Sequence, residues 1–106
     1  MNETSLIYAY IWEFHVKEEH RTEFEQVYGP EGEWVQLFKK GNGYLDTKLH
    51  RDVSNGKRYL TIDYWKSKAD YESFRQRYHK EFNLLDKQCE SLTEKEIFLG
   101  SFSCMR

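Results

Sequence analysis

Hydrophobic and aromatic residues fill the segment from Leu6 to Val16, and they fall on both parities of that run. Tyr10 and Trp12 share one parity, whereas Ile7 and Ile11 share the other. Aromatic and β-branched residues favour strands, and successive side chains along a strand point to opposite faces. The pattern therefore predicts a strand that is apolar on both faces.

The apolar spacing after this strand changes to that of a helix. The segment from Glu18 to Tyr28 starts with acidic residues and continues at helical spacing until Gly29-Pro30 ends it. A second helical pattern runs from Trp34 to Lys40 and is followed by Gly41-Asn42-Gly43. These patterns predict a first helix that is broken into two pieces.

Two further strands are predicted over Tyr44 to Val53 and Lys57 to Trp65, where β-branched and aromatic residues are again frequent. The segment Ser54-Asn55-Gly56 joins them. Asn-Gly is the strongest hairpin signal of two residues, because both central positions of a type I′ turn need a positive φ. We therefore expect a hairpin with a type I′ turn.

The last third of the chain predicts a helix and a closing strand. Ser67 with Asp70 three residues later resembles a capping box, and apolar residues then recur every three or four positions up to Leu92. This spacing indicates one long amphipathic helix, with room for a kink. Glu96 to Phe102 supplies a fourth strand. The order predicts one α+β domain over residues 1–106, with a ferredoxin-like βαββαβ fold and a four-stranded antiparallel sheet.

The predicted sheet has more apolar surface than its two helices can cover. In the third strand Leu60 and Ile62 alternate with Tyr59 and Thr61, so neither face has the polar pattern of a solvent face. An uncovered face would exceed the apolar patch that monomers usually tolerate, and a second sheet would cover it. We therefore expect a homodimer. The alternative is a monomer with an aromatic binding face.

Charge and composition narrow the classes of partner. Sixteen Lys and Arg residues against 18 Asp and Glu residues leave a net charge of −2, without the basic surplus that nucleic-acid binding requires. No apolar run reaches transmembrane length, and Met1 to Ser5 lacks the basic segment of a signal peptide. Cys89 and Cys104 lack metal-binding spacing and are expected to pack as reduced thiols. The sequence thus predicts a cytoplasmic protein that binds neither nucleic acid nor membrane.

The sequence also lacks the common signatures of bound metals and nucleotides. His15 and His20 resemble the inverted zincin pattern HxxEH, but one residue too many separates them. The other histidines, His50 and His79, stand alone. No Gly-rich dinucleotide fingerprint and no Gly-x-Ser-x-Gly motif occurs. We therefore predict no metal site and no bound cofactor.

The best candidate for a site lies at the end of the third predicted strand. Thr61, Asp63 and Trp65 share one parity, and Tyr71 begins the next helical stripe. Polar atoms and large rings could therefore converge on one pocket. The alternative is that these residues only stabilise the fold. Asp63 would then pair with an Arg or cap a helix, and Trp65 and Tyr71 would pack against each other in the core.

Three segments carry a resemblance to a known family. They are Glu13-Phe-His-Val-Lys17, Gly41-Asn-Gly-Tyr-Leu45 and Tyr64-Trp-Lys-Ser-Lys-Ala-Asp-Tyr-Glu-Ser-Phe74. Together they resemble the landmarks of the antibiotic biosynthesis monooxygenase (ABM) domain family, and the similarity extends from about Leu6 to Phe102. The resemblance implies a dimeric α+β barrel, in which each subunit has a pocket between its sheet and its helices.

The resemblance also implies a chemistry. Members that oxidise anthrones or quinols use neither metal nor flavin, because the deprotonated substrate reacts with oxygen directly. Trp65 and Tyr71 match pocket positions of such enzymes. Thr61 stands where these members have an Asn, and Leu85 stands where they have an Arg. The substrate implied is a small aromatic phenol, quinol or anthrone.

The candidate catalytic residues of this pocket are Trp65, Tyr71, Asp63 and His79. Because Thr61 and Leu85 depart from the family pattern, Asp63 or His79 is the alternative candidate for the base. The residues expected to contact the substrate are Thr61, Phe74 and Tyr78.

Two other functions are compatible with the same fold. Haem-degrading relatives use an Asn, a Trp and a His, and the matching positions here are Phe14, Phe74 and Leu84. His79 is out of register with that histidine, which disfavours haem degradation. The remaining alternative is a dimer that binds a small ligand or a partner without catalysis, because a fold alone does not assign function.

Overall fold

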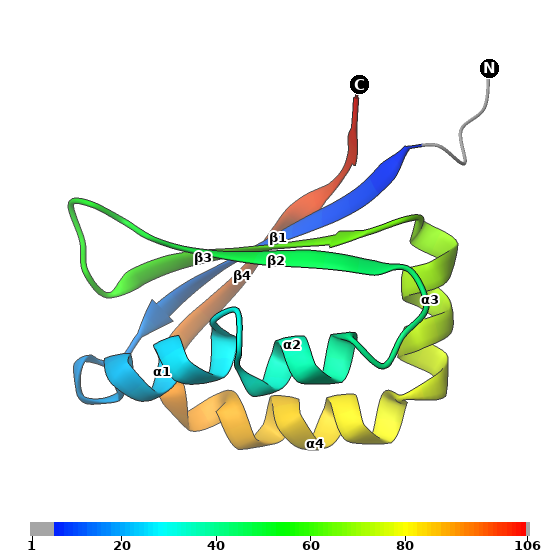
Figure 1. Cartoon of the computed structure of the whole chain (residues 1–106). Coiled ribbons are helices and arrows are strands. Elements are labelled where there is room, and N and C mark those ends of the chain that lie inside the picture. Colours follow the sequence, from blue (N-terminus) through cyan, green and yellow to red (C-terminus); the bar gives the residue numbers. More distant parts are fainter. Residues whose placement is uncertain (1–5, 106) are drawn as a thin grey trace.

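The four predicted strands form one antiparallel sheet in the computed structural model, which describes residues 6–105 (Figure 1). They are β1 (Ile7–Val16), β2 (Tyr44–Arg51), β3 (Arg58–Trp65) and β4 (Thr93–Cys104), in the spatial order β2-β3-β1-β4. The helices all lie on one face of this sheet (Figure 1). The α+β ferredoxin-like fold predicted from the sequence is therefore confirmed.

The first helix is interrupted, as the sequence predicts. A short 3₁₀ turn, η2 (Glu18–His20), leads into α1 (Arg21–Tyr28), and α2 (Glu33–Phe38) follows after Pro30. Proline favours this break because it has no backbone N–H for the helix and restricts the residue before it. Both helices direct large aromatic side chains toward the sheet, among them Phe24 and Phe38, which are at most 5% exposed.

The predicted second helix contains a kink, for which the sequence leaves room, and the kink at Tyr78 divides it into two helices. α3 (Lys68–Arg77) ends at Tyr78, and α4 (His79–Cys89) starts in a new direction before the 3₁₀ turn η3 (Glu90–Leu92) (Figure 1). The two halves pack on different partners. Phe74 of α3 lies 5.1 Å from the Trp65 ring, whereas Phe82 of α4 lies 4.9 Å from the Trp34 ring.

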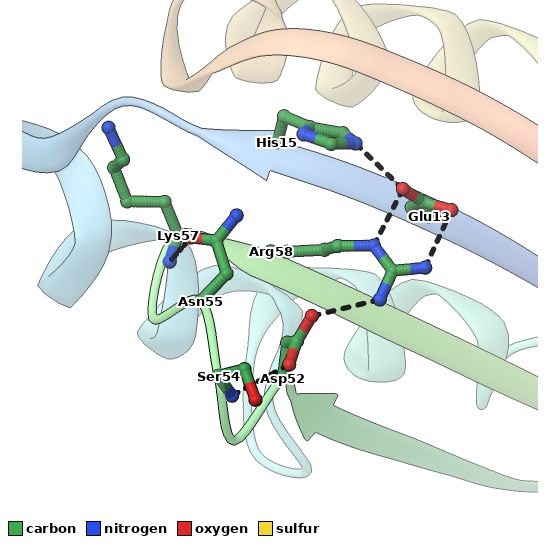
Figure 2. A network of polar contacts seen from close by, with 7 residues as sticks. All are labelled: Glu13, His15, Asp52, Ser54, Asn55, Lys57 and Arg58. Carbon is green, nitrogen blue, oxygen red and sulfur yellow. Dashed lines mark hydrogen bonds and ion pairs between the residues drawn. The ribbon is translucent and has the colours of Figure 1, made fainter.

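The hairpin between β2 and β3 is present, but its turn is not type I′. Neither Asn55 nor Gly56 has a positive φ. The loop is held instead by side chains, since Asp52 Oδ1 accepts from the Ser54 N–H at 2.8 Å and Asn55 Oδ1 accepts from the Lys57 N–H at 3.1 Å (Figure 2). Asp and Asn stabilise such turns by bonding to backbone two residues ahead. The loop is therefore longer than predicted.

An ionic network ties this loop to β1 (Figure 2). Arg58 Nε and Nη2 donate to the two Glu13 carboxylate oxygens at 2.8 and 3.2 Å, and Arg58 Nη1 donates to Asp52 Oδ2 at 2.9 Å. His15 Nε2 lies 2.7 Å from Glu13 Oε2. The hydrogen bonds from Arg58, followed by that with His15, lower the pKa of Glu13. The network lies on the sheet face that no helix covers.

The strand β3 separates the two faces of the sheet residue by residue. The side chains toward the helices are buried: Tyr59, Thr61, Asp63 and Trp65. The side chains on the other face are half-buried: Leu60, Ile62 and Tyr64. The second face is thus apolar in its centre, as expected from the sequence, and within residues 6–105 nothing packs on it as a layer (Figure 1).

The two cysteines differ in burial. Both are free thiols, with Cys89 buried in the core and Cys104 exposed at the end of β4. The expectation that both would pack is right for Cys89 and wrong for Cys104, because β4 extends beyond the helices that would cover it (Figure 1). No helix within residues 6–105 is long and apolar enough to cross a membrane.

Gly43 should tolerate no side chain. Its φ is +91°, and a Cβ there would overlap the Asp70 carboxylate group. We expect Gly43→Ala to cost about 1–3 kcal/mol of unfolding free energy in urea denaturation, because both the backbone conformation and the contact are strained. Gly56→Ala is the matched control, since its φ is not positive and its nearest neighbour is the flexible Arg21 side chain at 3.2 Å. Equal losses in the two variants would contradict this account.

Candidate functional site

A cavity of about 300 Å³ lies between the sheet and the helices. Most of its walls are aromatic, and all four strands and α1 to α4 contribute residues. The aromatic lining residues are Tyr10, Trp12, Phe14, Tyr28, Trp34, Phe38, Tyr71 and Phe82. The polar and charged lining residues are Thr47, Thr61, Asp63, Arg75, Asp86 and Glu96. A concave, mostly apolar site with a few polar groups is typical of a small-molecule pocket.

Three of the residues predicted for the site line this cavity. Thr61 and Asp63 come from β3, where they are only 4% and 5% exposed, and Tyr71 comes from the first turn of α3. The N-terminus of α3 is fixed by Ser67, whose Oγ accepts from the Asp70 N–H at 3.1 Å, as the sequence predicts. The convergence of strand and helix at this point brings the three residues together.

Trp65 lies behind the cavity rather than in its wall. It is fully buried, and its ring centroid lies 5.5 Å from that of Tyr71 and 5.1 Å from that of Phe74. Its Nε1 donates a hydrogen bond to the Tyr10 hydroxyl at 3.3 Å. Trp65 therefore supports the cavity residues Tyr10 and Tyr71 and does not itself line the cavity.

The other three predicted residues are also not part of the cavity lining. Phe74 is buried in the core, and together with Tyr78 it borders a separate, more polar hollow beside Lys40. His79 is exposed at the start of α4, where its Nδ1 lies 3.1 Å from the Gln76 carbonyl oxygen. His79 is the first residue of α4, directly after the bend at Tyr78, and it does not line the cavity as Phe82 and Asp86 of the same helix do. His79 thus has no position from which to act as a base in the cavity.

Asp63 is the buried acid of the cavity. Thr47 Oγ1 donates to Asp63 Oδ1 at 2.5 Å, and the Tyr44 hydroxyl lies 2.7 Å from the same Thr47 oxygen. Within residues 6–105 no hydrogen bond reaches Asp63 Oδ2, and no Arg, Lys or His forms an ion pair with the carboxylate. Burial raises the pKa of Asp63 to about 7, against the smaller opposing effect of the Thr47 hydrogen bond.

Arg75 is one of the cavity residues that sequence reasoning missed, and it is the one that carries a positive charge. Its Nη1 donates to the Tyr71 hydroxyl at 3.1 Å, and its guanidinium carbon lies 3.8 Å from the centroid of the Phe82 ring. Arg75 follows Tyr71 by four residues, which places both on one face of α3 and is the signal that could have revealed it. Leu85, where an Arg was expected, packs against the hydrophobic core.

The phenol of Tyr10 stays protonated at the floor of the cavity. Burial raises its pKa well above the ordinary value, and the charge of the nearby Asp63 raises it further. The site therefore combines one acid that titrates near neutral pH, a neutral phenol and a guanidinium, within aromatic walls. No group of three or more His, Cys, Asp or Glu side chains within residues 6–105 is placed to hold a metal ion. The arrangement can accept a proton from a flat ligand and hold the ligand away from water.

Solved structures with the same fold include two proteins described as oxygenases and one without a stated reaction. SnoaB, a cofactor-independent oxygenase from Streptomyces nogalater, has a TM-score of 0.77 and 17% identity, and the match covers 95% of each chain. A Bordetella bronchiseptica protein assigned to the antibiotic biosynthesis monooxygenases has a TM-score of 0.73 and 17% identity, over 95% of this chain and 99% of that one. A Pseudomonas aeruginosa protein has a TM-score of 0.65 and 18% identity, over 99% and 98%.

At such low sequence identity, these structural matches show that the fold is shared. The family assignment comes from a comparison of the sequence. No curated protein matches the chain. The model of the antibiotic biosynthesis monooxygenase family matches residues 7–82, which include β1 to α3 and most of the residues that line the cavity. The chain therefore belongs to the antibiotic biosynthesis monooxygenase family.

Proposed function

We propose that this protein is a cofactor-independent monooxygenase that acts on a small aromatic substrate such as a phenol, quinol or anthrone. The observation that carries the proposal is Asp63, a buried carboxylate in the wall of an aromatic cavity, of which one oxygen accepts no hydrogen bond from residues 6–105. A base is most effective when its pKa lies near the working pH, and the pKa of Asp63 is raised to about 7. Membership of the family supports the same reaction class.

The proposed reaction begins when Asp63 accepts a proton from the substrate. For an anthrone-type CH₂ group, the resulting carbanion forms a C–O bond with O₂ and becomes a peroxide. Loss of the second proton and cleavage of the O–O bond then give a ketone and water. The CH₂ carbon is oxidised by four electrons and O₂ is reduced by four. The protein contributes the base, the orientation of the substrate and the exclusion of water.

Two other cavity residues would act on the anion that forms. Arg75 places a positive charge at the helix wall, held in position by the Tyr71 hydroxyl and the Phe82 ring. Negative charge that moves from Asp63 to the substrate would be stabilised by this guanidinium, because charges interact strongly between apolar walls. Tyr71 then has a positioning role as well as a place in the lining.

The reaction can be tested by measuring oxygen uptake with 1,8-dihydroxyanthrone in buffer that contains chelator and no flavin or nicotinamide. We expect uptake well above the spontaneous rate without protein, and we expect no change when the chelator is removed. No histidine among residues 6–105 lines the cavity, so titration with haemin should give no haem degradation. If a panel of phenols, quinols and anthrones gives no uptake while one of them raises the melting temperature, the protein is a binding module instead.

The rate should depend on pH through Asp63. Because the base must be ionised, the rate should rise with pH, reach half its maximum near pH 7 and then level off. Thr47→Val removes a hydrogen bond that favours the carboxylate, so the midpoint should move to higher pH. Thr47→Ser should restore it. Ionisation of the substrate is the same for all three proteins and cannot cause a difference between them. Identical pH–rate profiles for the wild type and Thr47→Val would therefore contradict the role of Asp63.

We also propose that the protein is a homodimer through the sheet face that carries Leu60, Ile62 and Tyr64. Light scattering after size exclusion should give about twice the 12.9 kDa chain mass at micromolar concentration. Ile62→Glu should give monomers, because it places a charge in the apolar centre of the interface. Val53→Glu, in the fully exposed hairpin loop, is the control and should stay dimeric. A wild-type monomer would refute this assembly.

A further inference from the structure

The cavity meets solvent beside two carboxylates, Asp86 of α4 and Glu96 of β4. Both residues line the cavity and both are exposed. Within residues 6–105 neither forms an ion pair, and the hydrogen bond to Glu96 comes from the Thr93 hydroxyl at 3.1 Å. Desolvation of the carboxyl group by the surrounding protein raises the pKa of Glu96, the Thr93 hydrogen bond opposes this rise, and the charges of Asp86 and Glu90 add to it. The entrance therefore carries two carboxylates without a direct ion pair, and we expect a negative potential there.

The inner end of the cavity adds a third carboxylate. Asp63 is only 5% exposed, and its Oδ2 has no hydrogen-bond partner within the described part of the chain. Arg75 is the one cation among the lining residues: its Nη1 donates to the Tyr71 hydroxyl and its guanidinium lies over the Phe82 ring, while its Nε is buried without a hydrogen-bond partner within residues 6–105. Three carboxylates and one guanidinium thus surround the cavity. Low-dielectric walls focus such a field and weaken its screening by solvent.

We propose that Asp86 and Glu96 make this cavity select aromatic ligands without an anionic group over aromatic carboxylates. This inference rests on the proposed function, since it names the class of substrate that the same cavity takes. An aromatic carboxylate would bring a permanent negative charge past both entrance residues and toward Asp63. A neutral hydroxyaromatic brings none. It becomes an anion only when Asp63 takes its proton, so the total charge of the inner cavity does not change.

Two naphthalene probes of similar shape test this selectivity. At pH 7, 2-naphthol is neutral and 2-naphthoate is an anion, and quenching of Trp12 and Trp34 in the cavity wall can report binding. We expect 2-naphthol to bind at least about tenfold more tightly at low salt. In the double variant Asp86→Asn, Glu96→Gln, the ratio of the two dissociation constants should fall about tenfold, mainly because 2-naphthoate binds better.

The matched control is the double variant Glu81→Gln, Glu94→Gln. It changes the net charge by the same amount at exposed positions that do not line the cavity, so it should leave the ratio unchanged. Tighter binding of 2-naphthoate by the wild type would overturn the inference. An equal ratio in the wild type and the first double variant would also overturn it, as would failure of both probes to bind at millimolar concentration.

The outcome is separate from that of the oxygen-uptake test. Selectivity that depends on Asp86 and Glu96, without oxygen uptake from any aromatic compound, would refute the proposed reaction and support the inference. Oxygen uptake together with equal binding of the two probes would support the proposed reaction and refute the inference on selectivity.

Discussion

Replacement of Asp63 by Asn should lower the turnover number for an anthrone or quinol by about 10²- to 10⁴-fold, the usual contribution of a positioned general base. Asn keeps the shape of the side chain and can still accept the hydrogen bond from Thr47, whose Oγ1 lies 2.5 Å from Asp63 Oδ1. It cannot accept a proton from the substrate. Oxygen uptake at saturating substrate measures the effect.

The stability of this variant is the control for its activity. Asp63 has a pKa of about 7 in the folded protein, above the value near 3.9 of an unfolded chain. The folded state therefore binds more protons than the unfolded state between about pH 4 and pH 7, and its stability falls as pH rises through that range. Asn does not ionise, so Asp63→Asn does not lose stability as pH rises. The variant should be at least as stable as the wild type at pH 8. A variant that is fully active would show that Asp63 is not the base.

Truncation of Trp65 to Ala should have the largest effect on stability, about 3–5 kcal/mol of unfolding free energy. The ring is completely buried and lies within 6.0 Å, centroid to centroid, of Phe38, Tyr44 and Phe74. The total unfolding free energy of a domain of this size is roughly 5–15 kcal/mol, so the melting temperature should fall by more than about 10 °C. Differential scanning calorimetry measures both quantities.

Two further variants separate packing from other effects at this position. Trp65→Phe keeps most of the buried ring but loses the Nε1 hydrogen bond to Tyr10, so its loss should be smaller. Leu84→Ala removes an apolar side chain that is 60% exposed, and it should change the free energy by less than about 0.5 kcal/mol. A Trp65→Ala variant that melts at the wild-type temperature would show that Trp65 is not part of the core.

The strands and the broken first helix could be predicted from the sequence because each depends on local signals. The register of the hairpin could not be predicted from the sequence. A two-residue turn at Asn55-Gly56 would place Lys48 opposite Asp63, whereas the longer loop places Thr47 there. A shift of one residue exchanges the two faces of a strand. The hydrogen bond from Thr47 that holds the candidate base was therefore hidden from sequence reasoning.

The part of the candidate site that lies on a single strand could be predicted from the sequence. Thr61 and Asp63 lie two residues apart on β3, and their shared face follows from the alternation of a strand. Arg75 and His79 were harder to place because the apolar spacing continues through Tyr78, although the helix does not. Which aromatic rings each half of the helix contacts is a matter of tertiary packing, and the same packing puts Trp65 behind the cavity wall instead of in it.

The origin of the oxygen atom in the product tests the central claim most directly. An anthrone that turns over under ¹⁸O₂ in ordinary water, without added cofactor, should give a ketone that carries one labelled oxygen, with the other labelled atom in water. The converse experiment, with unlabelled O₂ in labelled water, should give an unlabelled ketone. A product whose new oxygen comes from water, or stoichiometric hydrogen peroxide without oxygen transfer, would contradict the assignment as a monooxygenase.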